Sequence, residues 1–245
     1  MNKIFISVII PAYNESKRIH ETLGSIEQYF KGKTFLHEVI VVDDGSSDGT
    51  PDLVLEYQNR ISRLRVLVNE KNRGKGFSVN RGMRAAHGEY RLFMDADNSV
   101  DISHLDIFMG LMGRGYDVVI GSIALDDASV TENSGWHRRI LGCISHVLVR
   151  LLAVSGIKDT QRGFKLFTCA AANKIFPKQT IERFGFDIEI LVIARKHKLK
   201  IKEAPVAWIN PIGSKVTLGS YFQTFRELLV IVRNRIFNKY STETP

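Results

Sequence analysis

The chain has 245 residues, of which 44% are apolar and 24% are charged. This composition excludes long disordered tracts and fits one α/β domain of larger than average size. The formal net charge is +8 and the pI is about 9.5, so we expect an anionic partner.

The excess of positive charge is concentrated near the end of the chain. From Arg195 onward there are ten Lys and Arg residues against three Glu. No zinc-finger spacing or aromatic–basic RNA motif accompanies this charge, so we expect no nucleic-acid partner. We therefore favour peripheral contact with an anionic membrane surface.

Short β-branched runs alternate with amphipathic stretches through the first half of the chain. The predicted strands are Ile4–Ile10, Glu38–Val42, Leu64–Val68, Tyr90–Met94 and Asp117–Gly121. The predicted helices are Glu15–Phe30, Thr50–Ile61 and Gly74–Ala86. For the second helix we expect Thr50 as N-cap and Pro51 at the first helical position. This alternation predicts an α/β fold with a mostly parallel, Rossmann-like sheet and helices on both faces.

The second half of the chain is less regular. We predict helices over Ile140–Ile157, Phe186–Lys198 and Tyr221–Phe237, and strands over Gly163–Thr168 and Lys200–Ile209. We expect a catalytic domain over residues 1–210 and a basic, amphipathic extension over residues 211–245 in the same structural unit. No signal-peptide layout precedes the first strand, and no uncharged apolar run reaches the roughly 18 residues of a membrane-spanning helix. We therefore expect that the protein is not integral to a membrane.

Polar, acidic loops follow three of the predicted strands. They are Pro11–Glu15, Asp43–Thr50 and Asp95–Asn98. Because ligands bind beyond the carboxyl ends of parallel strands, these loops predict a site at one edge of the sheet. Asp95 and Asp97 offer the oxygen ligands that Mg²⁺ or Mn²⁺ prefers, and a metal there would neutralise a departing diphosphate.

The loop after the second strand is acidic, so it is not a phosphate-binding P-loop. No G-x-G-x-x-G follows the first strand, which disfavours a dinucleotide cofactor. We expect Ser46–Thr50 to shape the turn, while the carboxylate of Asp44 accepts hydrogen bonds from a nucleoside.

Several motifs in this order resemble the inverting family-2 glycosyltransferases of GT-A fold: PAYNE, VVDDGSSDGT, NRGKG and MDAD. Two later segments, DTQRGFKLF and RFGFDIE, are similar to a narrower group, the polyprenyl-phosphate hexosyltransferases and especially the dolichyl-phosphate β-glucosyltransferases. The resemblance covers roughly residues 4–235.

The resemblance implies roles for individual residues. It implies nucleotide-sugar binding by Pro11, Tyr13, Glu15, Asp44, Lys75, Asp95 and Ala96. It implies that Asp95 and Asp97 hold the metal and the donor diphosphate. On the acceptor side it implies Gly163, Phe164, Lys165 and Arg138, with Arg138 meeting the acceptor phosphate. We assign catalytic roles to Asp97, Arg138, Asp187 and Glu189.

Two of these roles concern the sugar. Asp187 and Glu189 are candidates for orienting its hydroxyls, although Glu189 is equally compatible with a carboxylate on the surface of a helix.

The chain departs from the family pattern at two positions. Ser99 stands where the mannosyl-transferring branch typically carries Gln, which argues against mannose. Ile123 replaces the arginine of a Gly-Ser-Arg sequence, which removes a cation from the edge of the site.

The resemblance implies inverting transfer of a hexose, with UDP-glucose as the first choice of donor, to a polyprenyl phosphate. The expected location is the cytoplasmic face of a membrane, with peripheral attachment. One alternative is a glycosyltransferase that acts directly on a glycan or polysaccharide. The other is a nucleotide-sugar-binding protein without turnover, against which Asp95 and Asp97 argue.

Overall fold

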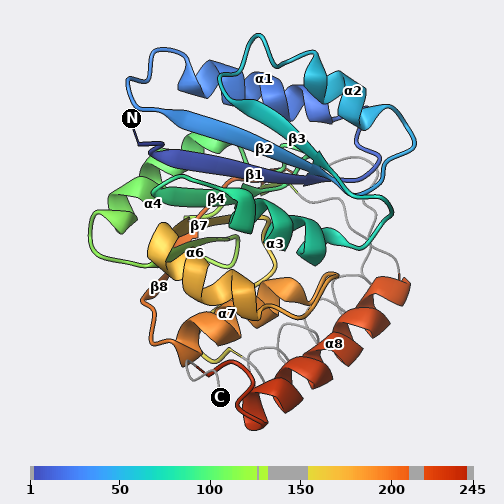
Figure 1. The fold of residues 1–245 in the computed structure, drawn as a ribbon. Coiled ribbons are helices and arrows are strands. Elements are labelled where there is room, and N and C mark those ends of the chain that lie inside the picture. The colour runs from blue at the N-terminus through green and yellow to red at the C-terminus, as the bar shows by residue number, and fades with distance from the viewer. Residues whose placement is uncertain (1–2, 126, 132–153, 210–217, 242–245) are drawn as a thin grey trace.

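The computed structural model describes residues 3–125, 127–131, 154–209 and 218–241 (Figure 1). Its main sheet has the strand order β3-β2-β1-β4-β7-β5-β8. The strands are β1 (Ile6–Ala12), β2 (His37–Asp43), β3 (Leu64–Val68), β4 (Tyr90–Met94), β5 (Val118–Ser122), β7 (Phe164–Thr168) and β8 (Ile201–Pro205). Two short strands, β6 (Val130–Thr131) and β9 (Trp208–Ile209), pair in parallel beside it.

Helices cover both faces of the sheet (Figure 1). Side chains of β1 alternate between the faces, with Val8 and Ile10 in one hydrophobic cluster and Ile9 in the other. The first cluster is completed by α1 (Ile19–Phe30), α2 (Thr50–Leu55) and α4 (Leu105–Met112), and the second by α3 (Lys75–Ala85), α6 (Cys169–Ile175) and α7 (Phe186–Lys196). Short 3-10 turns, η1 (Ile102–His104) and η2 (Phe176–Lys178), precede α4 and follow α6.

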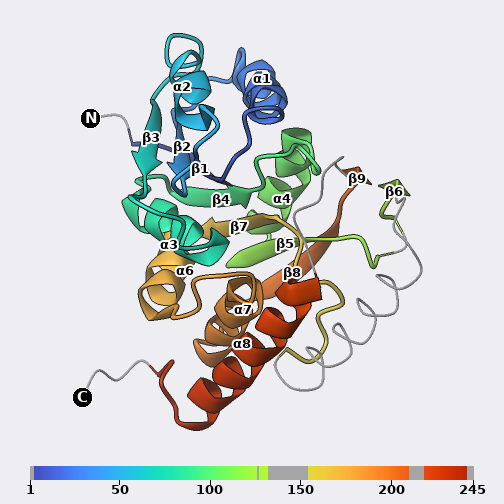
Figure 2. The same cartoon turned by 90° about the vertical axis from the view of Figure 1, so that its right-hand side faces the viewer.

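The long helix α8 (Leu218–Ile236) lies against α7 on the side away from the sheet (Figure 2). Leu228 and Ile231 of this helix are buried in the same hydrophobic cluster as α7. The Glu227 carboxylate accepts a hydrogen bond from the Gly185 N–H, 2.7 Å away, at the start of α7. The C-terminal helix therefore packs on the α/β core instead of extending away from it.

The mostly parallel sheet with helices on both faces confirms the predicted fold class. β7 is the exception, because it runs antiparallel to both β4 and β5. Its first residues therefore lie at the edge where the parallel strands end. This places Gly163 and Phe164 beside the loop that follows β4.

Several predicted boundaries are wrong. Residues 13–18 form a loop, so α1 starts at Ile19, and α2 ends at Leu55 with turns after it. Gly49, with a positive φ of 80°, precedes α2 in place of Thr50. The last predicted strand is interrupted after Pro205, and α4 was missed.

The predicted helix over Ile140–Ile157 lies mostly outside the described residues. Its last four residues, from Val154 to Ile157, are described and are not helical.

Candidate active site

The loops after β1 and β2 are joined by side-chain hydrogen bonds at the carboxyl edge of the sheet. Ser46 Oγ accepts from the Asn14 N–H at 2.8 Å, and Thr50 Oγ1 accepts from the Glu15 N–H at 2.9 Å. Asp48 accepts from the Ser16 N–H at 3.0 Å. The turn residues of the second loop thus fix the shape of the first, as far as the start of α1.

Asp44 holds the turn that precedes α3. Its carboxylate is buried and accepts hydrogen bonds from Asn69 Nδ2 at 2.7 Å, Arg73 N at 3.0 Å and Gly74 N at 2.7 Å. Gly74 has a φ of 112°, and a Cβ there would lie 2.6 Å from the Glu182 carbonyl oxygen. Asp44 therefore sets the position of the next residue, Lys75.

Lys75 and Asp95 form an ion pair at the start of α3, with Nζ 2.6 Å from Oδ1. The two side chains are only 23% and 24% exposed. Burial works to lower the pKa of Lys75, but the Asp95 and Asp187 carboxylates raise it above its ordinary value. Burial, together with the charges of Asp97 and Asp187, raises the pKa of Asp95 despite the nearby ammonium group. The Lys75 ammonium group thus places a positive charge near three carboxylates, those of Asp95, Asp187 and Asp97.

Asp97 lies on the same loop, with Oδ1 accepting from the Ser99 N–H at 3.1 Å. Its Oδ2 lies 3.9 Å from Arg18 Nη1. Arg18 also forms a two-pronged pair with Glu15, at 2.8 Å from each nitrogen to its oxygen. Sequence reasoning missed Arg18, although its i,i+3 spacing from Glu15 is a recognisable signal.

The start of β7 packs directly on the same loop. The Gly163 carbonyl accepts a hydrogen bond from Asp95 N at 3.0 Å. A Cβ on Gly163 would lie 2.0 Å from Asp95 Oδ2. A side chain at this position would therefore force the Asp95 carboxylate to move.

A buried ion pair lies on the sheet below this edge. Lys165 Nζ lies 2.6 Å from Asp187 Oδ1, with both side chains almost fully buried. Lys165 Nζ also donates to the Arg162 carbonyl at 2.5 Å. The pair links β7 to the first turn of α7, and Asp187 is close enough to raise the pKa of Lys75 and of Asp95.

Glu189 is fully buried, so the helix-surface position is excluded. Its Oε1 accepts from Thr180 Oγ1 at 2.6 Å and from Tyr240 OH at 2.7 Å. Its Oε2 accepts from the N–H groups of Thr180 and Ile181 at 2.9 and 2.8 Å. The carboxylate thus connects the segment before α7 to the end of the chain.

The remaining predicted residues have these places. Pro11 lies buried in β1, and Tyr13 is 39% exposed in the loop after it. Ala96 is buried, and its carbonyl accepts from Thr22 Oγ1 at 2.7 Å. Phe164 is buried in β7. Arg138 lies outside the described residues.

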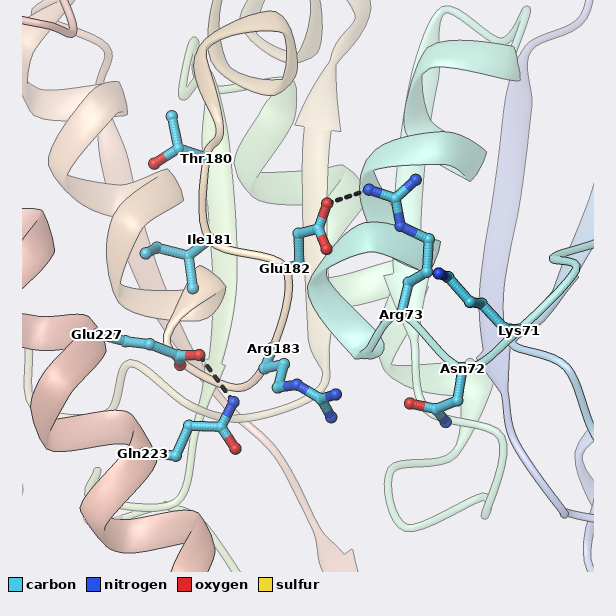
Figure 3. A pocket seen from close by; sticks show the side chains of 9 residues that line it. All are labelled: Lys71, Asn72, Arg73, Thr180, Ile181, Glu182, Arg183, Gln223 and Glu227. Carbon is cyan, nitrogen blue, oxygen red and sulfur yellow. Dashed lines mark hydrogen bonds and ion pairs between the residues drawn. The ribbon is translucent and has the colours of Figure 1, made fainter.

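A polar groove of about 730 Å³ lies beside this edge, between residues 71–73, residues 180–183 and α8 (Figure 3). Arg73 and Glu182 form an ion pair across part of it, and Gln223 Nε2 donates to Glu227 at 3.2 Å. Arg183 extends into the groove (Figure 3). Residues 71–73 lead directly to Lys75, so the groove adjoins the predicted donor site. Neither Asp95 nor Asp97 lines the groove, so the two are separate.

Asp95 and Asp97 supply some, but not all, of the oxygen ligands that a divalent metal needs. Within the described residues, no group of three or more His, Cys, Asp or Glu side chains gathers at one point. Two carboxylates with oxygen atoms near the sheet edge suit Mg²⁺ or Mn²⁺ when phosphate oxygens of a ligand complete the coordination.

Known proteins of one family resemble this chain. Residues 7–184 match the family model described as Glycosyl transferase family 2. The chain is similar to the dolichyl-phosphate beta-glucosyltransferase of Drosophila melanogaster, with 40% identity over 92% of this chain and 74% of that protein. It is 38% identical to the Homo sapiens protein of the same name, with the same coverage of both chains.

A solved structure shares the fold. This is glucosyl-3-phosphoglycerate synthase from Mycobacterium tuberculosis in complex with Mn²⁺, UDP-glucose and phosphoglyceric acid. The TM-score is 0.69 at 20% identity, over 94% of this chain and 80% of that one.

Proposed function

The chain belongs to glycosyl transferase family 2, and we propose that it transfers glucose from UDP-glucose to a polyprenyl phosphate such as dolichyl phosphate, with inversion at the anomeric carbon. The observation that carries this proposal is the identity of 38–40% with named dolichyl-phosphate beta-glucosyltransferases. The identity extends over 92% of the chain, and so beyond the general family match that ends at residue 184.

The donor side consists of the edge described above. Asp95 and Asp97 would hold Mg²⁺ or Mn²⁺, which neutralises charge on the departing diphosphate when bound. Lys75 supplies a second, fixed positive charge there. Pro11, Tyr13, Glu15, Asp44 and Ala96 keep their predicted nucleotide-sugar role, and the three hydrogen bonds of Asp44 favour an indirect role through the turn before Lys75.

The acceptor supplies its own nucleophile. A phosphate oxygen is anionic near neutral pH, so attack needs positioning and charge stabilisation more than a strong base. Its bond to the anomeric carbon forms as the bond from that carbon to the β-phosphate oxygen breaks, and the electron pair leaves with UDP. We assign Gly163, Phe164, Lys165 and Arg138 to the acceptor side.

Asp187 and Glu189 differ in what they offer the sugar. The Asp187 carboxylate is close enough to the Lys75–Asp95 pair to raise the pKa of both groups. Lys165 Nζ holds this carboxylate at 2.6 Å. Each oxygen of the Glu189 carboxylate already accepts two hydrogen bonds from protein groups. We therefore keep Asp187 as the candidate for orienting sugar hydroxyls and give Glu189 a positioning role.

A lipid acceptor requires access to a membrane surface, and α8 offers one. Among the described residues, no helix combines the length and apolar character needed to cross a bilayer. Phe225, Leu229 and Ile236 of α8 are 45%, 51% and 72% exposed. At helical spacing they share one face, with the exposed Arg226 and Arg233 beside it. We propose that this face, the α8 stripe, docks on anionic lipid at the cytoplasmic side of a membrane.

The test uses the purified chain with Mn²⁺ or Mg²⁺, a panel of radiolabelled nucleotide sugars and a short polyprenyl phosphate. We expect label from UDP-glucose to enter the organic phase and to be lost with Asp97→Ala. Donor hydrolysis without a lipid product would contradict the acceptor and favour a glycan acceptor. Transfer from a different nucleotide sugar would contradict glucose alone.

A further inference from the structure

Arg162, just before β7, is held on two sides. Its Nε lies 2.9 Å from Asp159 Oδ2, and its guanidinium carbon lies 4.7 Å from the centre of the Trp208 ring. Within the described part of the chain, no oxygen accepts from its two Nη nitrogens. The side chain is 22% exposed. Arg162 is thus a fixed cation, and no described residue accepts from one edge of its N–H donors.

The groups that hold Arg162 are themselves fixed. Asp159 is fully buried and also accepts from Ile123 N and Gln161 N, both at 3.2 Å. Trp208 lies in β9, which pairs with β6, and its backbone N–H donates to the Ser129 carbonyl at 2.9 Å. Because both partners are anchored, little conformational freedom remains to be lost when the guanidinium binds a ligand.

The position of Arg162 is next to the reaction centre. The following residue, Gly163, packs against the Asp95 carboxylate, and the Arg162 carbonyl accepts from Lys165 Nζ. The neighbouring strand of Trp208 is bonded to the loop of Asp97, since Ile209 N donates to the Ser99 carbonyl at 3.0 Å.

Arg162 also lies near Ile123, the apolar residue that directly follows β5. Ile123 and Arg162 share the Asp159 carboxylate, so the arginine lies beside the position at which the chain carries no cation. A guanidinium with a free pair of N–H donors matches the oxygens of a phosphate group.

We propose that Arg162 binds a phosphate group in the active site, either the phosphate of the acceptor or the diphosphate of the donor. This inference rests on the proposed function for the identity of the two ligands. Asp159 and Trp208 are positioning residues that aim the guanidinium.

The experiment measures binding and turnover separately on Arg162→Gln. Calorimetry gives the Kd for UDP with Mn²⁺ and the Kd for a short isoprenoid phosphate monoester, and transfer assays give KM and kcat. Loss of a hydrogen-bonded charge pair predicts a weakening of roughly 10- to 100-fold for one ligand. A weaker monoester with unchanged UDP assigns the acceptor phosphate, and the reverse assigns the donor.

Arg60→Gln is the matched control. Arg60 also pairs with a carboxylate, Glu27, and stacks on a ring, that of Tyr57, at 4.5 Å. It lies in the turns after α2, and we expect wild-type constants for its variant.

The proposal is overturned if Arg162→Gln leaves both Kd values within two-fold of wild type, whatever happens to its thermal stability. If that variant does not fold, Arg162→Lys is measured instead. It keeps a cation against Asp159 but lacks the planar fork, so unchanged affinities there also overturn the proposal. A wild type that binds both ligands without transferring glucose would refute the proposed function. The comparison of Kd values between wild type and Arg162→Gln would still test the role of Arg162.

Discussion

Lys75 Nζ lies 2.6 Å from Asp95 Oδ1, so the first residue of α3 and the first acidic residue after β4 form one charged unit. Backbone hydrogen bonds position both residues. Asp44 accepts from the Gly74 N–H, one residue before Lys75, and the Gly163 carbonyl accepts from the Asp95 N–H. An ammonium group in this position would compete with a bound divalent cation for Asp95 and would also help to neutralise the diphosphate of the proposed donor.

Replacing Lys75 by Met separates these two effects. We expect Lys75→Met to bind free Mn²⁺ more tightly than wild type, because the competing charge is gone. We expect kcat/KM to fall by roughly 10- to 100-fold, because the leaving diphosphate loses a fixed cation. Paramagnetic titration of Mn²⁺ and steady-state kinetics measure the two quantities. The control is Lys33→Met, which removes a surface lysine 3.5 Å from Asp106. Weaker Mn²⁺ binding in Lys75→Met would show that the lysine supports the metal instead of competing with it.

Gly163→Ala tests the contact between β7 and the Asp95 loop. A methyl group 2.0 Å from Asp95 Oδ2 forces the carboxylate or the strand to move. We expect at least a roughly 100-fold loss of kcat, since displacements of about 1 Å at reacting groups have this effect. We also expect weaker Mn²⁺–UDP binding. Gly110→Ala in α4, where a Cβ meets nothing within 4 Å, should keep wild-type activity. Equal activity in the two variants would refute the proposed importance of this contact.

The gathering of acidic loops at one edge of the sheet could be predicted because local rules determine it. Asp95 and Asp97 follow an apolar strand, and the carboxyl ends of parallel strands share an edge. The antiparallel direction of β7 was not predicted, since no local pattern specifies the direction in which a strand enters a sheet. The burial of Glu189 was not predicted either, because one of its partners, Tyr240, is 51 residues away in the chain and the others lie in a segment without regular secondary structure.

Glu189→Gln distinguishes positioning from sugar binding. An amide can keep its oxygen toward the N–H groups of Thr180 and Ile181, but its NH2 group then faces the hydroxyls of Thr180 and Tyr240. The two bonds that these hydroxyls donate to the carboxylate are lost, together with the buried charge that accepts them. We expect the free energy of unfolding in urea to fall by about 2–4 kcal/mol. Tyr240→Phe removes one of the four bonds and should cost about 1 kcal/mol. If Glu189→Gln keeps wild-type stability and loses only kcat, Glu189 contacts the sugar after all.

Asp48 predicts a specific dependence of stability on acid. Burial works to raise its pKa, but hydrogen bonds from Thr50 and Ser16 lower it to about 2 from an ordinary 3.8. The bonds favour the charged form, so their contribution is present above the unfolded pKa and is lost as pH falls toward the folded pKa. The stability difference between wild type and Asp48→Asn should be constant from pH 7 to 5 and shrink between pH 4 and 2. Urea titrations at each pH measure it, and a pH-independent difference would contradict this role.

The α8 stripe predicts membrane binding through particular side chains. Phe225→Ser with Leu229→Ser removes apolar surface that is 45% and 51% exposed. Leu55→Ser with Ile107→Ser removes two side chains with these same exposures from α2 and α4.

The two double variants are compared by co-sedimentation with vesicles of neutral lipid, with and without phosphatidylserine. Burial of these two side chains in the lipid interface contributes free energy to binding. We therefore expect a roughly 10- to 100-fold loss of vesicle affinity for the α8 variant only. Binding should also require phosphatidylserine and weaken with salt, because Arg226 and Arg233 flank the stripe. An equal loss in both double variants would mean that general surface hydrophobicity, and not α8, drives the contact. Wild-type chain that stays in the supernatant with every vesicle would refute docking through this face, and the lipid acceptor would then have to reach the Asp95 edge by another surface.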